Sequence, residues 1–158
     1  MTHNGKILAE GIIALSEPKE WAFAKLEWEV EDIFLQDDLM TCLCTHHPIK
    51  ELCYLYNTVN GNRTLVGNVC VNKFMGLPSG KIFSCIKRVT ADNSRPLNAE
   101  TLSHAWRKRW LTAWEFTFYK DTYRKRVLSD RQHLKRVQIN KRVLNCIRKS
   151  VPKSETQI

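Results

Sequence analysis

The chain has 158 residues, a formal net charge of +9 and a hydrophobic fraction of 43%. This length fits one compact domain, or a small module followed by a helical one, and the apolar fraction allows an ordinary folded core. No stretch reaches the roughly 20 apolar residues of a membrane-spanning helix. The apolar run at residues 7–15 does not have the pattern of a signal peptide, because Glu10 interrupts it. We therefore expect a cytoplasmic protein.

The positive charge is concentrated in the C-terminal third of the chain. Residues 1–100 contain 10 Lys/Arg against 12 Asp/Glu, whereas residues 101–158 contain 15 against 4. Such an asymmetry is typical of proteins that bind nucleic acid or another polyanion. A solvated helical face has the same composition, so charge alone does not decide between the two interpretations.

Local patterns in the first 66 residues predict a helix and then a β-hairpin. Ser16 is placed to cap a helix that begins at the next residue, and residues 28–35 fit either a helix or a strand. The strand formers that follow, together with the strong turn signal Asn60-Gly61, predict a two-residue hairpin over residues 52–66.

The rest of the chain predicts mainly helices. A short helix is expected at residues 69–74, a second from Ser79, a long third from Asn98, and a last one that opens with a capping box at residues 129–132. The two long helices are expected to form an antiparallel hairpin joined near residues 126–129. Apolar residues recur every four positions in the third helix: Leu102, Trp106, Trp110, Trp114 and Phe118. Tryptophans in such a stripe more often belong to a core than to an exposed stacking platform.

Four of the six cysteines lie within 29 residues and predict one structural zinc site. The absence of a secretory signal favours metal over disulfides. Cys42 and Cys44 would form a C-x-C knuckle, and Cys70 would lie in the first turn of the helix at 69–74, where the helix dipole favours a thiolate. Knuckle, hairpin and ligand-bearing helix follow one another as in a treble-clef zinc finger. That fold ordinarily has a C-x-x-C knuckle and two helix ligands, so the fourth ligand must come from elsewhere.

The fourth ligand is open between His46 and Cys53. His46 can curl back from the knuckle, whereas the predicted hairpin register brings Cys53 opposite Asn68, close to the helix ligand. Geometry slightly favours Cys53, and His47 is a weaker candidate. Glu51 is the only carboxylate between Cys42 and Cys70, so we expect a structural rather than a catalytic metal. The alternative is that these cysteines are simply buried hydrophobic residues.

Residues 42–49 read CLCTHHPI, and residues 66–74 read VGNVCVNKF. These runs resemble a group of small, uncharacterised phage and bacterial proteins with the pattern C-x-C-G-H-x-I, a hairpin, and V-G-N-x-C-V-x-x-F. Thr45 stands where that pattern has Gly. The resemblance covers about residues 20–90, and the start of the last helix at residues 128–132 is also similar. It implies His46 as the fourth zinc ligand and a phage or mobile-element origin, but no activity. Cys42, Cys44, His46 and Cys70 are therefore the predicted ligands, with Cys53 as the alternate.

Basic side chains dominate the last two predicted helices. Arg131, Lys135 and Arg142 fall at spacings that place them on one stripe, which could follow a row of phosphates. No base-reading motif is present, so binding is expected to be directed at the nucleic-acid backbone. The residues predicted to contact nucleic acid are Arg124, Lys125, Arg126, Arg131, Lys135, Arg136, Lys141 and Arg142.

The sequence therefore predicts an α+β protein with three parts. Residues 1–90 form a zinc-stabilised, treble-clef-like hairpin module, residues 91–150 a basic helical region, and residues 151–158 a disordered tail. The expected function is that of a non-enzymatic accessory protein that binds DNA or RNA. The alternative is an adaptor or inhibitor with a protein partner. An enzyme such as a nuclease is the least favoured, because paired carboxylates, a nucleophile elbow and a phosphate loop are all missing from the sequence.

Overall fold

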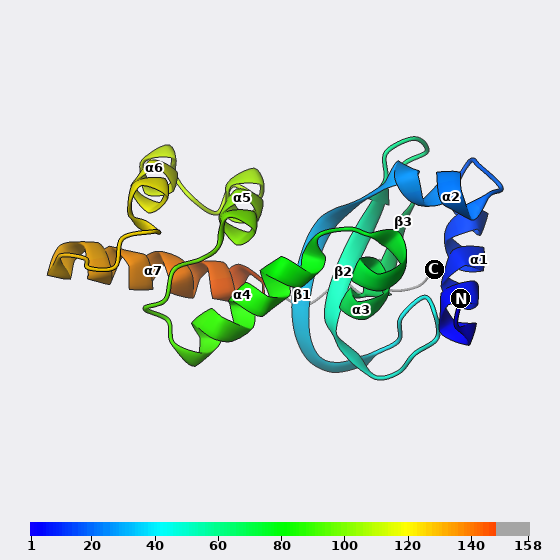
Figure 1. The fold of residues 1–158 in the computed structure, drawn as a ribbon, viewed down its shortest axis with the longest axis horizontal. Coiled ribbons are helices and arrows are strands. Elements are labelled where there is room, and N and C mark those ends of the chain that lie inside the picture. Colours follow the sequence, from blue (N-terminus) through cyan, green and yellow to red (C-terminus); the bar gives the residue numbers. More distant parts are fainter. Residues whose placement is uncertain (148–158) are drawn as a thin grey trace. The chain divides into compact units, whose positions relative to one another are not determined.

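The structure is a computed structural model that describes residues 1–147, and at residues 36–39 it describes the backbone alone. It confirms the α+β class, with helices and one three-stranded antiparallel sheet (Figure 1). The elements are α1 (His3–Ala14), α2 (Trp21–Ala24), η1 (Lys25–Glu27), β1 (Trp28–Met40), β2 (Ile49–Asn57), β3 (Arg63–Gly67), α3 (Asn68–Cys70), η2 (Val71–Met75), α4 (Ser79–Ala91), α5 (Ala99–Arg107), α6 (Ala113–Thr122) and α7 (Asp130–Ile147). None of the helices within residues 1–147 is long and apolar enough to cross a membrane.

The described chain divides into two compact units, residues 1–80 and residues 81–147. The division falls at the first turn of α4, and the boundary predicted at residue 90 lies at the other end of the same helix. The tail predicted at residues 151–158 lies outside the described residues.

The first unit begins with a helix that the sequence patterns did not predict. The Thr2 hydroxyl accepts a hydrogen bond from the Gly5 amide and caps α1, whose Leu8 and Ile12 are fully buried. The helix predicted to start after Ser16 is wrong, because only the single turn α2 forms there. The Ser16 hydroxyl instead donates to the Ile12 carbonyl at 2.6 Å and accepts from the Trp28 indole at 2.8 Å, which ties α1 to the start of β1.

The three strands form an antiparallel meander in the order β1-β2-β3. Side chains on both faces of β2 are buried, which explains why this strand is a nearly continuous apolar run. One face carries a cluster of four buried side chains: Phe34, Leu52, Tyr54 and Leu65. Met40 and Ile49 pack against this cluster.

The β2–β3 hairpin forms where it was predicted, but its register is wrong by two residues. Leu55 pairs with Thr64 rather than Val66, and Cys53 pairs with Val66 rather than Asn68. The cause is the Asn57 side chain, whose oxygen accepts from two backbone amides of the loop, at 2.8 and 3.1 Å. Asn57 and residue 62 then close a four-residue loop in place of a two-residue turn.

The second unit contains two helices where the sequence predicted one long helix from Asn98. Asn98 does cap a helix, but α5 ends at Arg107, and Arg109 has a left-handed backbone with φ of 61°. A capping box then starts α6, in which Thr112 and Glu115 bond reciprocally through side chain and backbone. The capping box predicted at the start of α7, with Ser129 and Gln132, is confirmed.

This break changes the positions of the tryptophans. Trp106 is 40% exposed and Trp114 is 63% exposed, so their prediction as core residues is wrong. The core of this unit instead contains Tyr119, whose hydroxyl accepts from the Leu97 amide and donates to Asn140.

Candidate metal centre and basic surface

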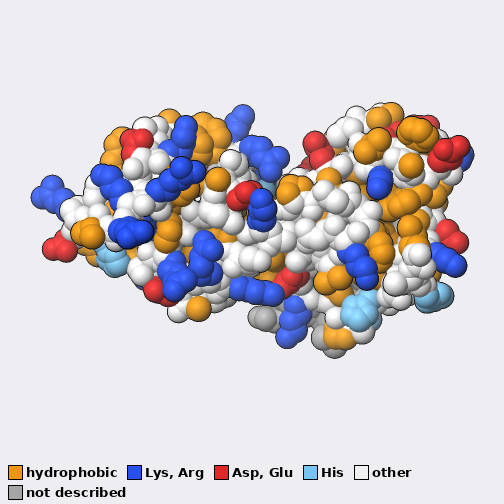
Figure 2. All heavy atoms as spheres, viewed as in Figure 1, with side chains coloured by type: hydrophobic (Ala, Val, Ile, Leu, Met, Phe, Trp, Pro, Cys, Tyr) orange, Lys and Arg blue, Asp and Glu red, His pale blue; other side chains and the backbone are white. Residues whose placement is uncertain are grey.

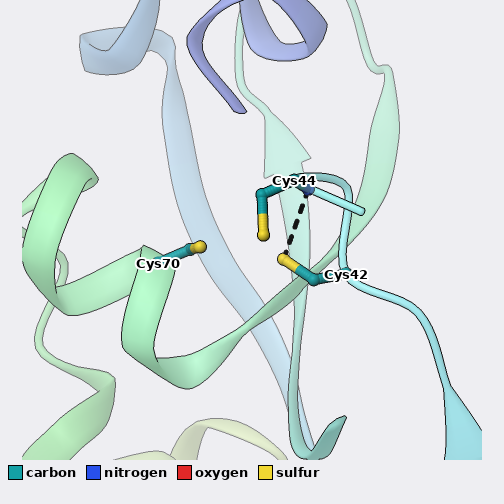
Figure 3. A group of neighbouring side chains, drawn as sticks. All are labelled: Cys42, Cys44 and Cys70. Atoms are coloured by element: carbon teal, nitrogen blue, oxygen red, sulfur yellow. Dashed lines mark hydrogen bonds between the residues drawn. The ribbon is translucent and has the colours of Figure 1, made fainter. Parts of the chain in front are cut away.

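Three buried thiols converge at the base of the hairpin. Cys42 and Cys44 come from the loop between β1 and β2, and Cys70 comes from the first turn of the helix that follows β3 (Figure 3). Their sulfur atoms all lie within 4.8 Å of one another. A tetrahedral zinc ion with Zn–S bonds of 2.3 Å needs sulfurs about 3.8 Å apart. A small contraction would therefore let these three side chains hold one metal ion.

Backbone amides are directed at the Cys42 sulfur. It accepts from the Gly67 amide at 3.2 Å and from the Cys44 amide at 3.5 Å. A hydrogen bond from the Cys70 thiol contributes most to lowering the pKa of Cys42, and these amides add to it against the opposing effect of burial. The same thiol–thiol contact raises the pKa of Cys70. Of the three sulfur atoms, that of Cys42 therefore has the surroundings that most favour a thiolate, the form of cysteine that binds metals.

The loop that carries Cys42 and Cys44 makes a tight turn. The Thr45 amide donates to the Cys42 carbonyl at 2.8 Å, and Thr45 has a left-handed backbone with φ of 73°. A β-branched residue is strained in this conformation, which glycine adopts freely. The position therefore has a backbone requirement that Gly would satisfy better than Thr.

The structure does not bring any candidate fourth ligand into the group. Among the side chains that it describes, only Cys42, Cys44 and Cys70 belong to the cluster. His46 is exposed, although its carbonyl accepts from the Cys42 amide at 3.0 Å. His47 is also exposed and shares a hydrogen bond with the Thr41 hydroxyl.

Cys53 lies in the middle strand, paired with Val66, and is fully buried. This burial raises the pKa of Cys53 to about 12, so its thiol keeps its proton at neutral pH. A protonated thiol inside a sheet behaves as a small apolar residue. The fourth ligand remains a prediction.

Helix α1 packs against the cysteine loop. Gly11 lies against Leu43, and a methyl group on Gly11 would approach the Leu43 side chain to 3.0 Å. The Asn4 amide lies 3.7 Å from the Cys44 sulfur. The sequence patterns did not predict this helix. The only sequence feature that indicates its contact with the cysteine loop is the presence of glycines, which allow close packing.

A polar cluster lies beside the third cysteine. The Ser79 hydroxyl donates to the Asn68 side-chain oxygen at 2.6 Å, and the Gly80 amide donates to the Asn72 side-chain oxygen at 3.0 Å. Asn68 and Asn72 flank Cys70 on the same helical segment and are linked to each other at 2.6 Å. These bonds join the helical segment that carries Cys70 to the first turn of α4.

The eight predicted nucleic-acid-binding residues do not share one environment. Arg136 is buried and donates to the Thr122 carbonyl at 2.7 Å. Lys135 and Arg142 are half-buried and pair with Glu115 at 3.0 and 2.6 Å. The other five are exposed: Arg124, Lys125, Arg126, Arg131 and Lys141.

The ion pairs with Glu115 hold the start of α6 against α7. Burial raises the pKa of Glu115, but hydrogen bonds from Arg142, the Thr112 amide and Lys135 together outweigh it and lower the pKa to about 2. Part of the predicted basic stripe therefore stabilises the fold instead of facing solvent.

Comparison of the chain with protein-family models, with curated proteins and with solved structures finds no match. The resemblance to phage and bacterial proteins therefore stays a prediction.

Proposed function

We propose that this chain is a non-enzymatic accessory protein that binds nucleic acid through its second unit. The observation that carries the proposal is the segregation of charge between the units. Residues 1–80 contain 6 Lys/Arg against 10 Asp/Glu, whereas residues 81–147 contain 16 against 5, a net of +11. Figure 2 shows basic side chains gathered over the part of the molecule formed by α5, α6 and α7. A field of this sign on one small unit attracts phosphates.

The exposed basic residues supply the contacts in this proposal. Arg124, Lys125 and Arg126 lie together in the connection between α6 and α7, and Arg131 and Lys141 lie exposed on α7. Guanidinium and ammonium groups in such positions reach phosphate oxygens without burying their charge. Such contacts recognise the nucleic-acid backbone and do not distinguish one base sequence from another.

The first unit would be a treble-clef-like module stabilised by structural zinc. Cys42, Cys44 and Cys70 would be three ligands, and we propose His46 as the fourth, because the hydrogen bond between its backbone and Cys42 keeps it next to the knuckle. The imidazole would turn inward from solvent to complete the tetrahedron. Three buried sulfurs and one imidazole form a closed donor set, which suits a structural role.

A titration of fluorescent oligonucleotides by anisotropy at several salt concentrations tests the function. We expect binding that weakens with salt, with a slope of about 0.9 per phosphate contact on duplex DNA. Arg131→Glu and Lys141→Glu should each weaken binding and reduce the slope. Lys19→Glu, the same change at an exposed position of the first unit, should leave both unchanged. A dissociation constant weaker than about 10⁻⁴ M at physiological salt would contradict the proposal.

A protein partner is the second candidate, and one observation favours it. The large apolar side chains that the first unit exposes include Phe23, Leu26 and Val59, at 58, 73 and 63%. The last two are on neighbouring segments, because the Thr58 amide donates to the Glu27 carbonyl at 2.8 Å. Apolar groups gathered in this way are typical of a docking surface. A photo-crosslinking residue at position 59 should trap a partner in cells, whereas one at Val127, exposed in the second unit, should not.

A further inference from the structure

A hollow of about 480 Å³ opens on the second unit between α5 and the end of α6. Leu102 and Ser103 line it from α5, and Phe116, Lys120, Tyr123 and Arg124 line it from α6 and the residues after it. Its size is in the range of pockets that take small organic groups. Its lining combines apolar, aromatic and cationic side chains, which distinguishes it from a simple gap in packing.

An aromatic pair, an exposed Trp106 and a half-buried Phe116, borders this hollow. Trp106 stacks on Phe116 with ring centroids 4.6 Å apart and an interplanar angle of 12°. Phe116 also lines the hollow, and Trp106 is 40% exposed. Phe116 covers one face of the Trp106 indole, so a flat ring that joins this pair would have to stack on the area of Trp106 that is still exposed.

The cations at the hollow are held against aromatic rings. The Lys120 ammonium lies 5.3 Å from the centre of Phe116, and the Arg124 guanidinium lies 5.3 Å from the centre of Tyr123. Both side chains are exposed. Positive charges beside an open aromatic face match the two parts of a nucleotide, a flat base and an anionic phosphate.

We propose that this groove binds unpaired nucleotides of a single-stranded nucleic acid. A base stacks on the Trp106–Phe116 pair, and Lys120 and Arg124 contact the flanking phosphates. The inference rests on the proposed function and narrows its ligand, because bases inside a duplex have no free face to stack on. A neutral apolar peptide would not use the two cations.

The test compares fluorescein-labelled dT12 and U12 with a 12-base-pair duplex, by anisotropy, on the full chain. We expect single strands to bind at least tenfold more tightly than the duplex. Trp106→Ala should weaken dT12 binding about 5- to 150-fold, the effect of losing one stacked base. Trp106→Phe should retain most of the affinity. Phe23→Ala, which removes an exposed aromatic ring from the first unit, should leave it unchanged.

The charge contacts give an independent readout in which every aromatic ring of the groove is retained. Lys120→Ala and Arg124→Ala should each reduce the salt slope for dT12 by about 0.7. Circular dichroism identifies any variant that fails to fold. If Trp106→Ala fails to fold, the salt slopes of Lys120→Ala and Arg124→Ala decide whether the groove binds single strands. Unchanged dT12 binding in folded Trp106→Ala, unchanged slopes, or equal affinity for single strand and duplex would overturn the groove and leave the proposed function standing. Failure of all three oligonucleotides to bind would overturn both.

Discussion

Replacing Tyr119 with Phe removes one oxygen atom from the centre of the second unit. That hydroxyl is fully buried, accepts from the Leu97 amide at 2.8 Å and donates to the Asn140 side-chain oxygen at 2.7 Å. The Asn140 amide in turn donates to the carbonyls of Asn93 and Arg95 at 2.9 and 2.7 Å. One hydroxyl therefore links α6, α7 and the connection before α5 through a closed polar network.

The expected cost follows from the groups that lose their partner. The Leu97 amide and the Asn140 oxygen would both be left buried without a hydrogen bond, and each such group costs about 1–3 kcal/mol. We expect Tyr119→Phe to lower the free energy of unfolding by about 2–4 kcal/mol. With a urea m-value of about 2 kcal/mol/M, the unfolding midpoint would fall by about 1–2 M.

Urea denaturation followed by far-UV circular dichroism measures this change. Tyr56→Phe is the matched control, because Tyr56 is half-buried and the same chemical change there should move stability by less than about 0.5 kcal/mol. If the Tyr119 and Tyr56 variants unfold at the same urea concentration, the network does not stabilise the unit and the reasoning is refuted.

Three further predictions concern the metal site and the ion pairs. Thr45→Gly should raise the free energy of unfolding by about 1 kcal/mol, since it relieves a left-handed backbone; a lower melting temperature would count against this. Purified protein should contain one equivalent of zinc by elemental analysis. The zinc content should be lost in Cys70→Ser, reduced in His46→Ala and unchanged in Cys53→Ser. A reduced content in Cys53→Ser with an unchanged content in His46→Ala would make Cys53 the fourth ligand. Because the pKa of Glu115 is about 2, below its unfolded value near 4.3, this carboxylate contributes stability above about pH 5 that is lost as pH falls toward 2. Glu115→Gln should therefore flatten the acid limb of a pH–stability curve, and an unchanged limb would exclude this linkage.

Features that depend on a few neighbouring residues could be predicted from the sequence. The caps at Asn98 and Ser129 were found because a capping side chain reaches only two or three residues along the chain. A short helix was expected at residues 69–74, and α3 and η2 together cover residues 68–75. Each of these signals is complete within one helical turn.

Features set by distant contacts could not be predicted. The glycines of α1 lower its helix propensity, yet the structure needs one of them at Leu43 of the knuckle, thirty-two positions away. The hairpin register depends on which amides the Asn57 side chain captures, and the turn signal at Asn60-Gly61 does not report this. The sequence around Arg109 gives no local sign that the helix predicted from Asn98 is interrupted there.

In the candidate metal site, too, some features could be predicted from the sequence and others could not. The three cysteines were expected to meet because a knuckle and a helix start are local structures whose relative position the hairpin sets. That expectation survived a register error, since Cys70 follows the end of β3 wherever its partner strand is aligned. His46 is exposed in the structure, and the spacing of residues in the sequence does not encode the direction of its side chain.

The bonds from Ser79 and Gly80 to the asparagines on either side of Cys70 determine the shortest fragment that can test metal binding in isolation. A fragment cut after Pro78, in the apparent loop before α4, would delete the hydroxyl and the amide that Asn68 and Asn72 use. Those two side chains would keep the bond between them but lose both of these partners on α4. A fragment that retains the first turn of α4 keeps these bonds to the helical segment that carries Cys70, so its affinity for added zinc should match that of the whole chain more closely.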